Sequence, residues 1–198
     1  MACAISCFGN SPNFPLFLLQ FMKGIFMEPK INIFEDLDGK KIVMIHDIRF
    51  KGKRKINWKE VESYLKEYVG SCFEIAETAE KLYIGTTLPD EFSWSDDSKR
   101  LQGTLAKAKA NAAQGIQQLI EVASNKRYQE NMKEKHTKDA KNGWYRYTSN
   151  FALPVYDEDG NTLRYNVFRI EMLVRHAKDG KMYLYDMVNI KKRTEQTV

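Results

Sequence analysis

Residues 135–148, KHTKDAKNGWYRYT, bring together the side-chain types that chemistry on RNA requires. The stretch holds His136, one of three histidines in the chain, together with several lysines, Arg146 and three aromatic residues within four positions. Histidine titrates near neutral pH, arginine and lysine bind phosphate, and exposed aromatic rings stack on bases. A helix end followed by an ordinary amphipathic strand would produce the same pattern, and the spacing alone does not decide between the two interpretations.

Cleavage of RNA without a metal ion is the reaction that this inventory suits. The ribose 2′-OH attacks the neighbouring phosphate, so one group must take its proton and another must protonate the leaving oxygen. His136 is the candidate acid or base, while Arg146 and Arg169 would hold the phosphate and stabilise the charge that develops on it. Tyr147 or Tyr185 would assist.

Glu171 is the second candidate for proton transfer, although a cross-strand ion pair with Arg169 is the simpler expectation for it. The other cationic and aromatic residues on or beside the same strands are candidates for RNA binding, namely Lys135, Trp144, Tyr145, Arg164, Tyr165 and Arg175. No partner is evident for His46, which follows an early strand.

Several classes of function are unsupported by the sequence. It contains no phosphate-binding loop, dinucleotide-binding glycine motif, serine-hydrolase elbow or HExxH motif, so no cofactor is expected. Three cysteines and three widely spaced histidines argue against a disulfide framework and against a zinc or other metal site, and they favour a reducing cytoplasm. The net charge of +5 permits a polyanionic partner without demanding one.

The first 26 residues differ from the rest of the chain because they are apolar and nearly uncharged. Their apolar run, residues 14–22, is shorter than the roughly 20 residues that a membrane-spanning helix needs, and prolines interrupt it. We expect a poorly ordered extension ahead of a domain that starts near Met27, with a segment lying on a membrane as the alternative.

Residues 27–80 predict a small N-terminal α/β segment. Its expected elements are a strand at 42–45, a helix at 58–69 capped by Asn57, and strands at 72–75 and 81–85. Residues 86–100, rich in Ser, Asp and Thr, predict a polar loop.

Two helices are expected next. Apolar residues at helical spacing predict a long helix from residue 101 or 104 to 125, with its small alanines lying close against a sheet. Lys107, Lys109 and Asn111 fall on other faces and are expected in solvent. Residues 126–141 are strongly charged and predict a second, poorly buried helix that carries His136.

The last third predicts three antiparallel strands, at residues 144–155, 163–175 and 182–190, joined by DEDG and KDG turns. Alternation places Phe168, Ile170, Met172 and Val174 on the face that the alanine-rich helix covers. In the last strand Val188 is expected on this face as well. The pairing predicted from the turn lengths sets Arg169 opposite Ser149, and a one-residue bulge in the first strand would change it.

The strings KAKANAAQGIQQLIEVA, DAKNGWYRY, RYNVF and DGKMYLYDMVNIKK resemble a family of domains in mobile-element proteins of Gram-positive bacteria. These are the large polyvalent protein-associated domains, phage-type nucleases of the barnase–EndoU–colicin–RelE fold. The resemblance covers roughly residues 81–192 and implies helices on a four-stranded sheet and a nuclease activity. It carries over only His136, Arg146 and Tyr147, because active residues differ between subfamilies.

The sequence thus predicts an α+β fold in which helices pack on one face of a C-terminal antiparallel sheet, with a small N-terminal α/β extension ahead of a nuclease-like domain at residues 81–198. The expected function is a toxin-like, metal-independent endoribonuclease of a phage or conjugative element, acting in the cytoplasm of the bacterial host. RNA is the expected partner, and a cognate inhibitor protein is a second candidate partner. The alternative is a catalytically inert module of the same fold that binds RNA or a protein.

Overall fold

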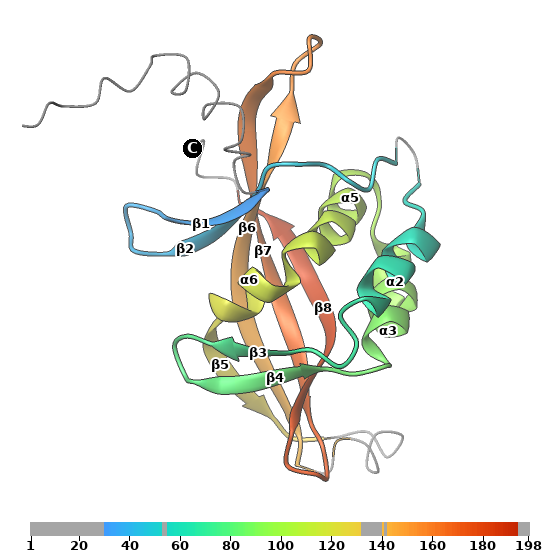
Figure 1. The fold of residues 1–198 in the computed structure, drawn as a ribbon, viewed down its shortest axis with the longest axis vertical. Coiled ribbons are helices and arrows are strands. Elements are labelled where there is room, and N and C mark those ends of the chain that lie inside the picture. The colour runs from blue at the N-terminus through green and yellow to red at the C-terminus, as the bar shows by residue number, and fades with distance from the viewer. Residues whose placement is uncertain (1–29, 53–54, 132–139, 141, 194–198) are drawn as a thin grey trace, which may run out of the picture.

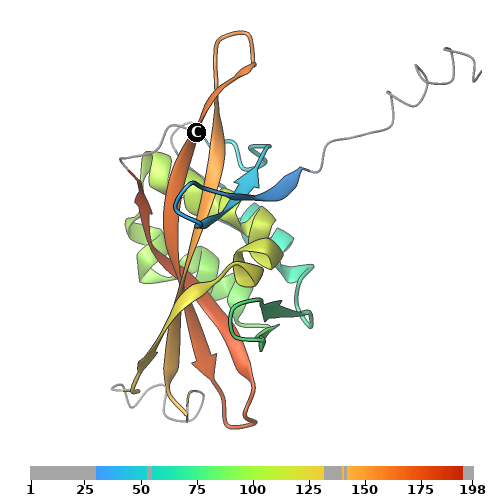
Figure 2. The ribbon, with the colours of Figure 1, turned by 90° about the vertical axis from the view of Figure 1, so that its left-hand side faces the viewer.

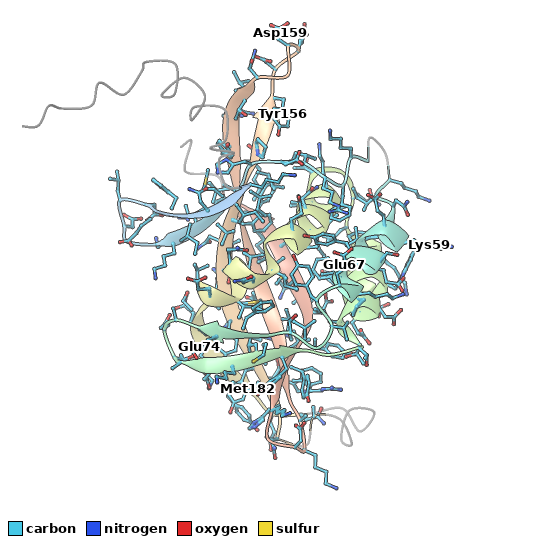
Figure 3. All side chains as sticks on the ribbon, viewed as in Figure 1. Lys59, Glu67, Glu74, Tyr156, Asp159 and Met182 are labelled. Atoms are coloured by element: carbon cyan, nitrogen blue, oxygen red, sulfur yellow. The ribbon has the colours of Figure 1, made fainter. Side chains whose placement is uncertain are left out.

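Three long strands near the C-terminus form the centre of the fold, and they are β6 (Trp144–Tyr156), β7 (Thr162–His176) and β8 (Met182–Lys192). The structure is a computed structural model that describes residues 30–52, 55–131, 140 and 142–193. The three strands pair as an antiparallel meander, which confirms the arrangement predicted from their alternation and turns. The hairpin between β6 and β7 projects beyond the rest of the fold, with Asp159 at its tip (Figures 2 and 3).

Two N-terminal hairpins extend this meander on both sides, and β5 (Ser124–Gln129) pairs with β6 as the eighth strand of one sheet. The strands of the two hairpins are β1 (Ile31–Glu35), β2 (Lys41–Ile45), β3 (Cys72–Ile75) and β4 (Glu80–Ile84). The strand order is β1-β2-β6-β7-β8-β4-β3, in which β2 runs parallel to β6 and β4 runs parallel to β8. The boundary expected at residue 81 therefore falls inside a strand of this common sheet.

The helices are short and follow one another along one side of the sheet (Figure 1). They are α2 (Trp58–Lys66), α3 (Leu88–Trp94), α4 (Asp96–Arg100), α5 (Gly103–Ala112), a 3₁₀ turn (Ala113–Gly115) and α6 (Ile116–Glu121). Together with the sheet they confirm the predicted α+β class.

The core lies between α5, α6 and one face of the central strands. The strands contribute Tyr147, Phe151, Phe168, Ile170, Met172, Val174, Leu184, Met187 and Ile190, and the helices contribute Ala108, Ala112, Ile116, Leu119 and Ile120. Gly115 lies where the helix breaks, and a Cβ there would stand 3.3 Å from side-chain carbons of Val43 and Ile45. The small residues therefore let the helix approach the sheet closely, as predicted.

The prediction of a loop over residues 86–100 is wrong, because this stretch forms α3 and α4. Pro89 occupies the first turn of α3, where a missing N–H is harmless. Ser95 caps α4 by accepting a hydrogen bond from the backbone N–H of Ser98. Pro89 and Ser95, which suggested turns in the sequence, thus lie at the starts of two helices.

The helix expected over residues 126–141 is also wrong in its described part. Residues in this region form strand β5 (Ser124–Gln129), which pairs antiparallel with the first half of β6. Its side chains are mostly exposed, and charged residues are common on edge strands of this kind. Pairing with β6 overrides a local preference for helix.

Lys109 and Asn111, which were expected in solvent, are fully buried. The Asn111 side chain accepts a hydrogen bond from the Phe50 backbone N–H at 3.1 Å and donates one to the Phe50 carbonyl at 3.2 Å. Other segments, including the one that holds Phe50, cover the sides of α5 that do not face the sheet. Its polar residues Lys109 and Asn111 are therefore buried as well.

The predicted register of the central strands is off by one residue. Arg169 pairs with Asn150 rather than with Ser149, because the pairing shifts near the β6–β7 turn and leaves Leu163 of β7 unmatched. The bulge thus lies in the second strand of the hairpin. A second register shift, between Leu184 and Asp186 of β8, places Met187 in the core where Val188 was expected, and a third, near Asn189, whose φ is 54°, returns Ile190 to the core.

Candidate nucleic-acid interface

The face of the central sheet turned away from α5 and α6 carries the polar side chains of β6 and β7. On β6, Tyr147 and Ser149 point into the core, so Arg146, Thr148 and Asn150 lie on the opposite face. The pairing brings together on that face Arg127 with Arg146, Thr148 with Glu171, and Asn150 with Arg169.

A cleft of about 830 Å³ opens on this face, between the part of β6 that pairs with β5 and the part that pairs with β2. Thr148 and Asn150 line it in the middle. Five of its lining residues are cationic and two are acidic: Lys40, Lys41, Arg127, Arg169 and Arg193, with Glu77 and Glu121. Three of these cations pair with carboxylates outside the lining, Lys40 with Asp38, Arg127 with Glu171 and Arg193 with Asp36. Lys41 and Arg169, which form no ion pair among the described residues, are therefore the cations that make the cleft attractive to an anion.

Arg169 is the cation best placed to receive such an anion. Its side chain is exposed, and its Nη2 donates a hydrogen bond to the hydroxyl of Thr148 at 3.3 Å. Among the described residues it makes no ion pair, so a neutral hydroxyl is the partner that holds the guanidinium in place. A guanidinium of this kind can bind a phosphate in a bidentate manner without first breaking an ion pair.

Glu171 lies beside the cleft and compensates the charge of two other arginines. Its carboxylate accepts hydrogen bonds from Arg127 Nη2 at 2.9 Å, from Asn189 Nδ2 at 3.0 Å and from Arg146 Nη1 at 3.5 Å. Burial acts to raise the pKa of Glu171, but the hydrogen bonds from Asn189 and Arg127 and the charges of Arg127 and Arg146 outweigh it and hold this pKa below its usual range. The carboxylate is therefore ionised at neutral pH. The ion pair considered for Glu171 thus exists, with Arg127 and Arg146 as its partners instead of Arg169.

Tyr147 and Tyr185 lie away from this cleft. The Tyr147 side chain is fully buried on the core face, where its hydroxyl donates to Glu80 Oε2 at 2.8 Å. The Tyr185 hydroxyl donates to Glu91 Oε1 on α3 at 2.5 Å. Burial and these hydrogen bonds to carboxylates raise the pKa of both hydroxyls. Neither tyrosine shares a site with Arg146 or Arg169.

The aromatic candidates for RNA binding are engaged with other side chains. Trp144 is largely buried, with its ring 5.1 Å from that of Tyr185, and Tyr145 packs against Tyr128 at 5.4 Å between ring centroids. Tyr165 bonds a histidine described below.

The cationic candidates are spread over the sheet. Arg175 lies over the ring of Tyr183, and Arg164 is exposed on the projecting β6–β7 hairpin. Lys135 and His136 lie outside the described residues. Of the predicted site residues that the structure describes, Arg169 lines the cleft, and Arg146 and Glu171 adjoin it.

Sequence reasoning missed most of the cleft. Arg127 was assigned to a helix, although the alternation in its strand sets it beside Arg146. Lys40 and Lys41 follow a turn, and Arg193 follows the last strand, so no local pattern links them. His46 was left without a partner, whereas its ring nitrogens contact Tyr165 and Asn32.

Other kinds of site have no support in the part of the chain that the structure describes. In that part, no group of three or more His, Cys, Asp or Glu side chains is placed to hold a metal ion. None of the described helices is long and apolar enough to cross a membrane.

Comparison with models of protein families, with curated proteins and with solved structures returned no match to this chain.

Proposed function

We propose that this chain binds RNA through the arginine-lined cleft, with the sugar–phosphate backbone as the main element recognised. The observation that carries the proposal is the exposed guanidinium of Arg169, which is held by the hydroxyl of Thr148 at 3.3 Å. Phosphate contacts by arginine and lysine supply most of the affinity in sequence-independent binding of nucleic acids. The amide of Asn150 and the hydroxyl of Thr148 add groups that can bond a ribose 2′-OH.

Cleavage of the bound RNA by 2′-OH attack is the second candidate function, with His136 as acid or base. Glu171 is a weak base, because its pKa is lowered and its oxygens accept hydrogen bonds from Arg127, Arg146 and Asn189, and Tyr147 is buried on the other face. We therefore keep His136 as the candidate for proton transfer. The strands on either side of its segment pair through Gln129 and Trp144, two residues from Arg146. Gln129 and Trp144 thus lie at the same end of the sheet as Arg146.

We further propose that the chain is a divergent member of the polyvalent-protein nuclease family of barnase–EndoU–colicin–RelE fold, acting in the cytoplasm of a bacterial host. Helices packed on one face of a long antiparallel meander support this assignment. Two additional hairpins, attached through the parallel pairs β2–β6 and β4–β8, are a departure from the predicted four-stranded sheet.

The test of binding is fluorescence anisotropy with a labelled single-stranded RNA, titrated at several salt concentrations. Arg169→Ala should weaken binding roughly tenfold, because a hydrogen bond to a charged group contributes about 1.5 kcal/mol or more. It should also make the slope of log K against log salt shallower by about 0.7, the value for one phosphate contact on a single strand. Arg164→Ala is the matched control, since it removes an exposed arginine from the same strand outside the cleft. Equal losses in the two variants would show that only overall charge matters.

A further inference from the structure

A second group of polar side chains comes from β1, from the residue that follows β2 and from β7, which lies on the other side of β6 from β2, and it takes no part in the cleft. The His46 ring is in its centre. Its Nδ1 lies 2.7 Å from the hydroxyl oxygen of Tyr165, and its Nε2 lies 2.5 Å from Oδ1 of Asn32. Asn32 and His46 belong to the β1–β2 hairpin and its end, whereas Tyr165 lies 119 positions from His46 and reaches it across β6.

The hydrogen bonds fix which atom donates in each contact. The Asn32 Oδ1 atom can only accept, so His46 Nε2 is the donor in this contact, and the neutral ring that makes this bond carries no proton on Nδ1. Nδ1 then presents a lone pair, and the Tyr165 hydroxyl donates its proton toward that lone pair. The imidazole is therefore oriented to take a proton from this tyrosine.

The group shares a face of the sheet with the cleft. Tyr165 packs against a small apolar cluster that includes Val167, and Arg169 follows two positions later on the same face of β7. Tyr165 and His46 are half-buried and Asn32 is exposed, so the hydroxyl is not sealed inside the protein.

Arg193 links the two places. Its backbone N–H donates to the Val167 carbonyl at 2.9 Å, and its side chain lines the cleft. The Arg193 guanidinium also pairs with Asp36 at 3.8 Å, so a phosphate bound here would share this cation with a carboxylate.

Proteins activate a hydroxyl nucleophile by hydrogen-bonding it to a general base, and a third group holds that base in the correct orientation. We propose that Tyr165 is a nucleophile toward a phosphodiester, that His46 is its general base and that Asn32 is a positioning residue for His46. This inference goes beyond binding in the cleft, and it does not require His136.

The step balances with the groups at hand. The Tyr165 hydroxyl proton passes to His46 Nδ1 while the phenolic oxygen forms a bond to phosphorus. The bond between phosphorus and the leaving oxygen breaks, that oxygen keeps the electron pair, and the proton on His46 passes to it. The product is a phosphotyrosyl ester, which a water or a second hydroxyl can open by the reverse sequence.

The experiment uses thymidine 5′-(4-nitrophenyl phosphate), a small diester that does not need the cleft. The full chain should release 4-nitrophenolate in a burst of about one equivalent, as expected for a covalent intermediate. Peptide mapping by mass spectrometry should find the nucleotidyl group on Tyr165. Tyr165→Phe should abolish both signals, whereas Tyr156→Phe, which removes a nearby hydroxyl that donates to the His46 carbonyl, should keep them.

Variants of the other two residues separate catalysis from structure. His46→Ala should slow the burst by about 10²–10⁴-fold, and added imidazole should restore part of the rate. Asn32→Ala should slow it as well, whereas Asn32→Asp, which keeps an acceptor oxygen for Nε2, should react much like the original chain. Loss of fold alone would not be reversed by imidazole or by the aspartate.

The inference is overturned if the full chain gives neither a burst nor an adduct, or if the adduct lies on another residue. The bond between His46 and Tyr165 would then be a structural tie between β2 and β7. Anisotropy with RNA on the same samples keeps the two proposals apart. RNA binding without a burst overturns the inference and leaves the proposal of RNA binding in the cleft in place. A burst without RNA binding overturns the cleft proposal and supports Tyr165 as a nucleophile.

Discussion

The Lys109 ammonium lies 3.0 Å from a carboxylate oxygen of Asp186 in a region of the interior that solvent does not reach. Asp97 contributes a second carboxylate oxygen at 3.3 Å, and the ring of Phe92 lies 5.1 Å from the same ammonium. The other Asp186 oxygen accepts a hydrogen bond from the Ser95 hydroxyl at 2.8 Å. The pair thus joins α5 to β8 and to the start of α4 through a fully bonded polar group.

Removing one partner of this pair should be strongly destabilising. Lys109→Met leaves Asp186 buried without its cation and should lower the free energy of unfolding by about 3–5 kcal/mol, as measured by denaturant titration. The double variant Lys109→Met/Asp186→Leu should recover most of that loss, because no buried charge is left unpaired. Lys107→Met, on the same helix, is the control and should change stability little. A single variant as stable as the control would mean that water reaches the pair.

The pair also predicts a dependence of stability on pH. Burial raises the pKa of Asp186 to about 6, more than the neighbouring Lys109 charge lowers it. In the unfolded chain an aspartate titrates near pH ~4, so between about pH 4 and 6 the folded state holds this proton more tightly than the unfolded state does. The contribution of Asp186 is therefore fully present below about pH 4 and is lost as the pH rises through about 6, by about 3 kcal/mol at most.

This dependence can be measured as the difference in unfolding free energy between the original chain and Asp186→Asn at a series of pH values. The difference should fall as the pH rises from 4 to 6 and then level off. A difference that rises with pH would show that Lys109 dominates and holds the carboxylate ionised.

The assignment of the sheet faces predicts large effects at Ile170 and Leu184, whose side chains are fully buried in the core. Changing either residue to Ala should lower the free energy of unfolding by about 2–5 kcal/mol, because the deletion leaves a cavity. Leu163→Ala serves as control, since this leucine is two-thirds exposed beside the β6–β7 turn. Effects at Ile170 as small as at Leu163 would contradict the assignment.

Glu171→Gln should act on RNA binding in the direction opposite to Arg169→Ala. The change removes the negative charge that compensates Arg127 and Arg146, so both guanidiniums become available to phosphate. RNA affinity should rise, by up to roughly tenfold, and its salt dependence should steepen. Glu158→Gln makes the same change of charge on the projecting hairpin and should have a much smaller effect. Weaker binding by the Glu171 variant would indicate that the carboxylate positions the arginines for RNA.

RNA cleavage would depend on His136. If the chain cleaves RNA, His136→Ala should lower the rate by about 10²–10⁴-fold through loss of a proton-transfer step, with binding unchanged. Cleavage should continue in the presence of a chelator and should be lost on DNA of the same sequence, which lacks the 2′-OH. The measurement is gel analysis of a labelled RNA, with His176→Ala as the control histidine. Unchanged cleavage by His136→Ala would remove this residue from the mechanism.

The central meander could be predicted because its signals are local. Alternation from Phe168 to Val174 and the glycines at the two turns identify the strands and the buried face without reference to other segments. The alanine-rich helix was likewise identified from its own periodicity, but a 3₁₀ turn at Gly115 breaks it, and it ends at Glu121 rather than at residue 125 because Ser124 and Asn125 belong to β5.

The cleft could not be predicted, because it depends on pairings between distant segments. β5 becomes a strand only through its contact with β6, and the register that places Arg169 beside Thr148 follows from a bulge near Leu163. Lys109 was assigned to solvent for a related reason, since its partner Asp186 lies 77 positions away. The sequence around a charged residue does not indicate which distant residue will form an ion pair with it.

The parallel attachment of the two N-terminal hairpins has a consequence for the order in which the protein can fold during synthesis. β2 needs β6, and β4 needs β8, so both hairpins leave the ribosome before the strands they join have been made. β2, with Val43 and Ile45, lacks its neighbouring strand until β6 has emerged, and β4, with Leu82, lacks its neighbour until β8 has emerged. Neither hairpin can therefore join the sheet while it is being synthesised, and the β3–β4 hairpin has to wait for β8, the last strand to be made.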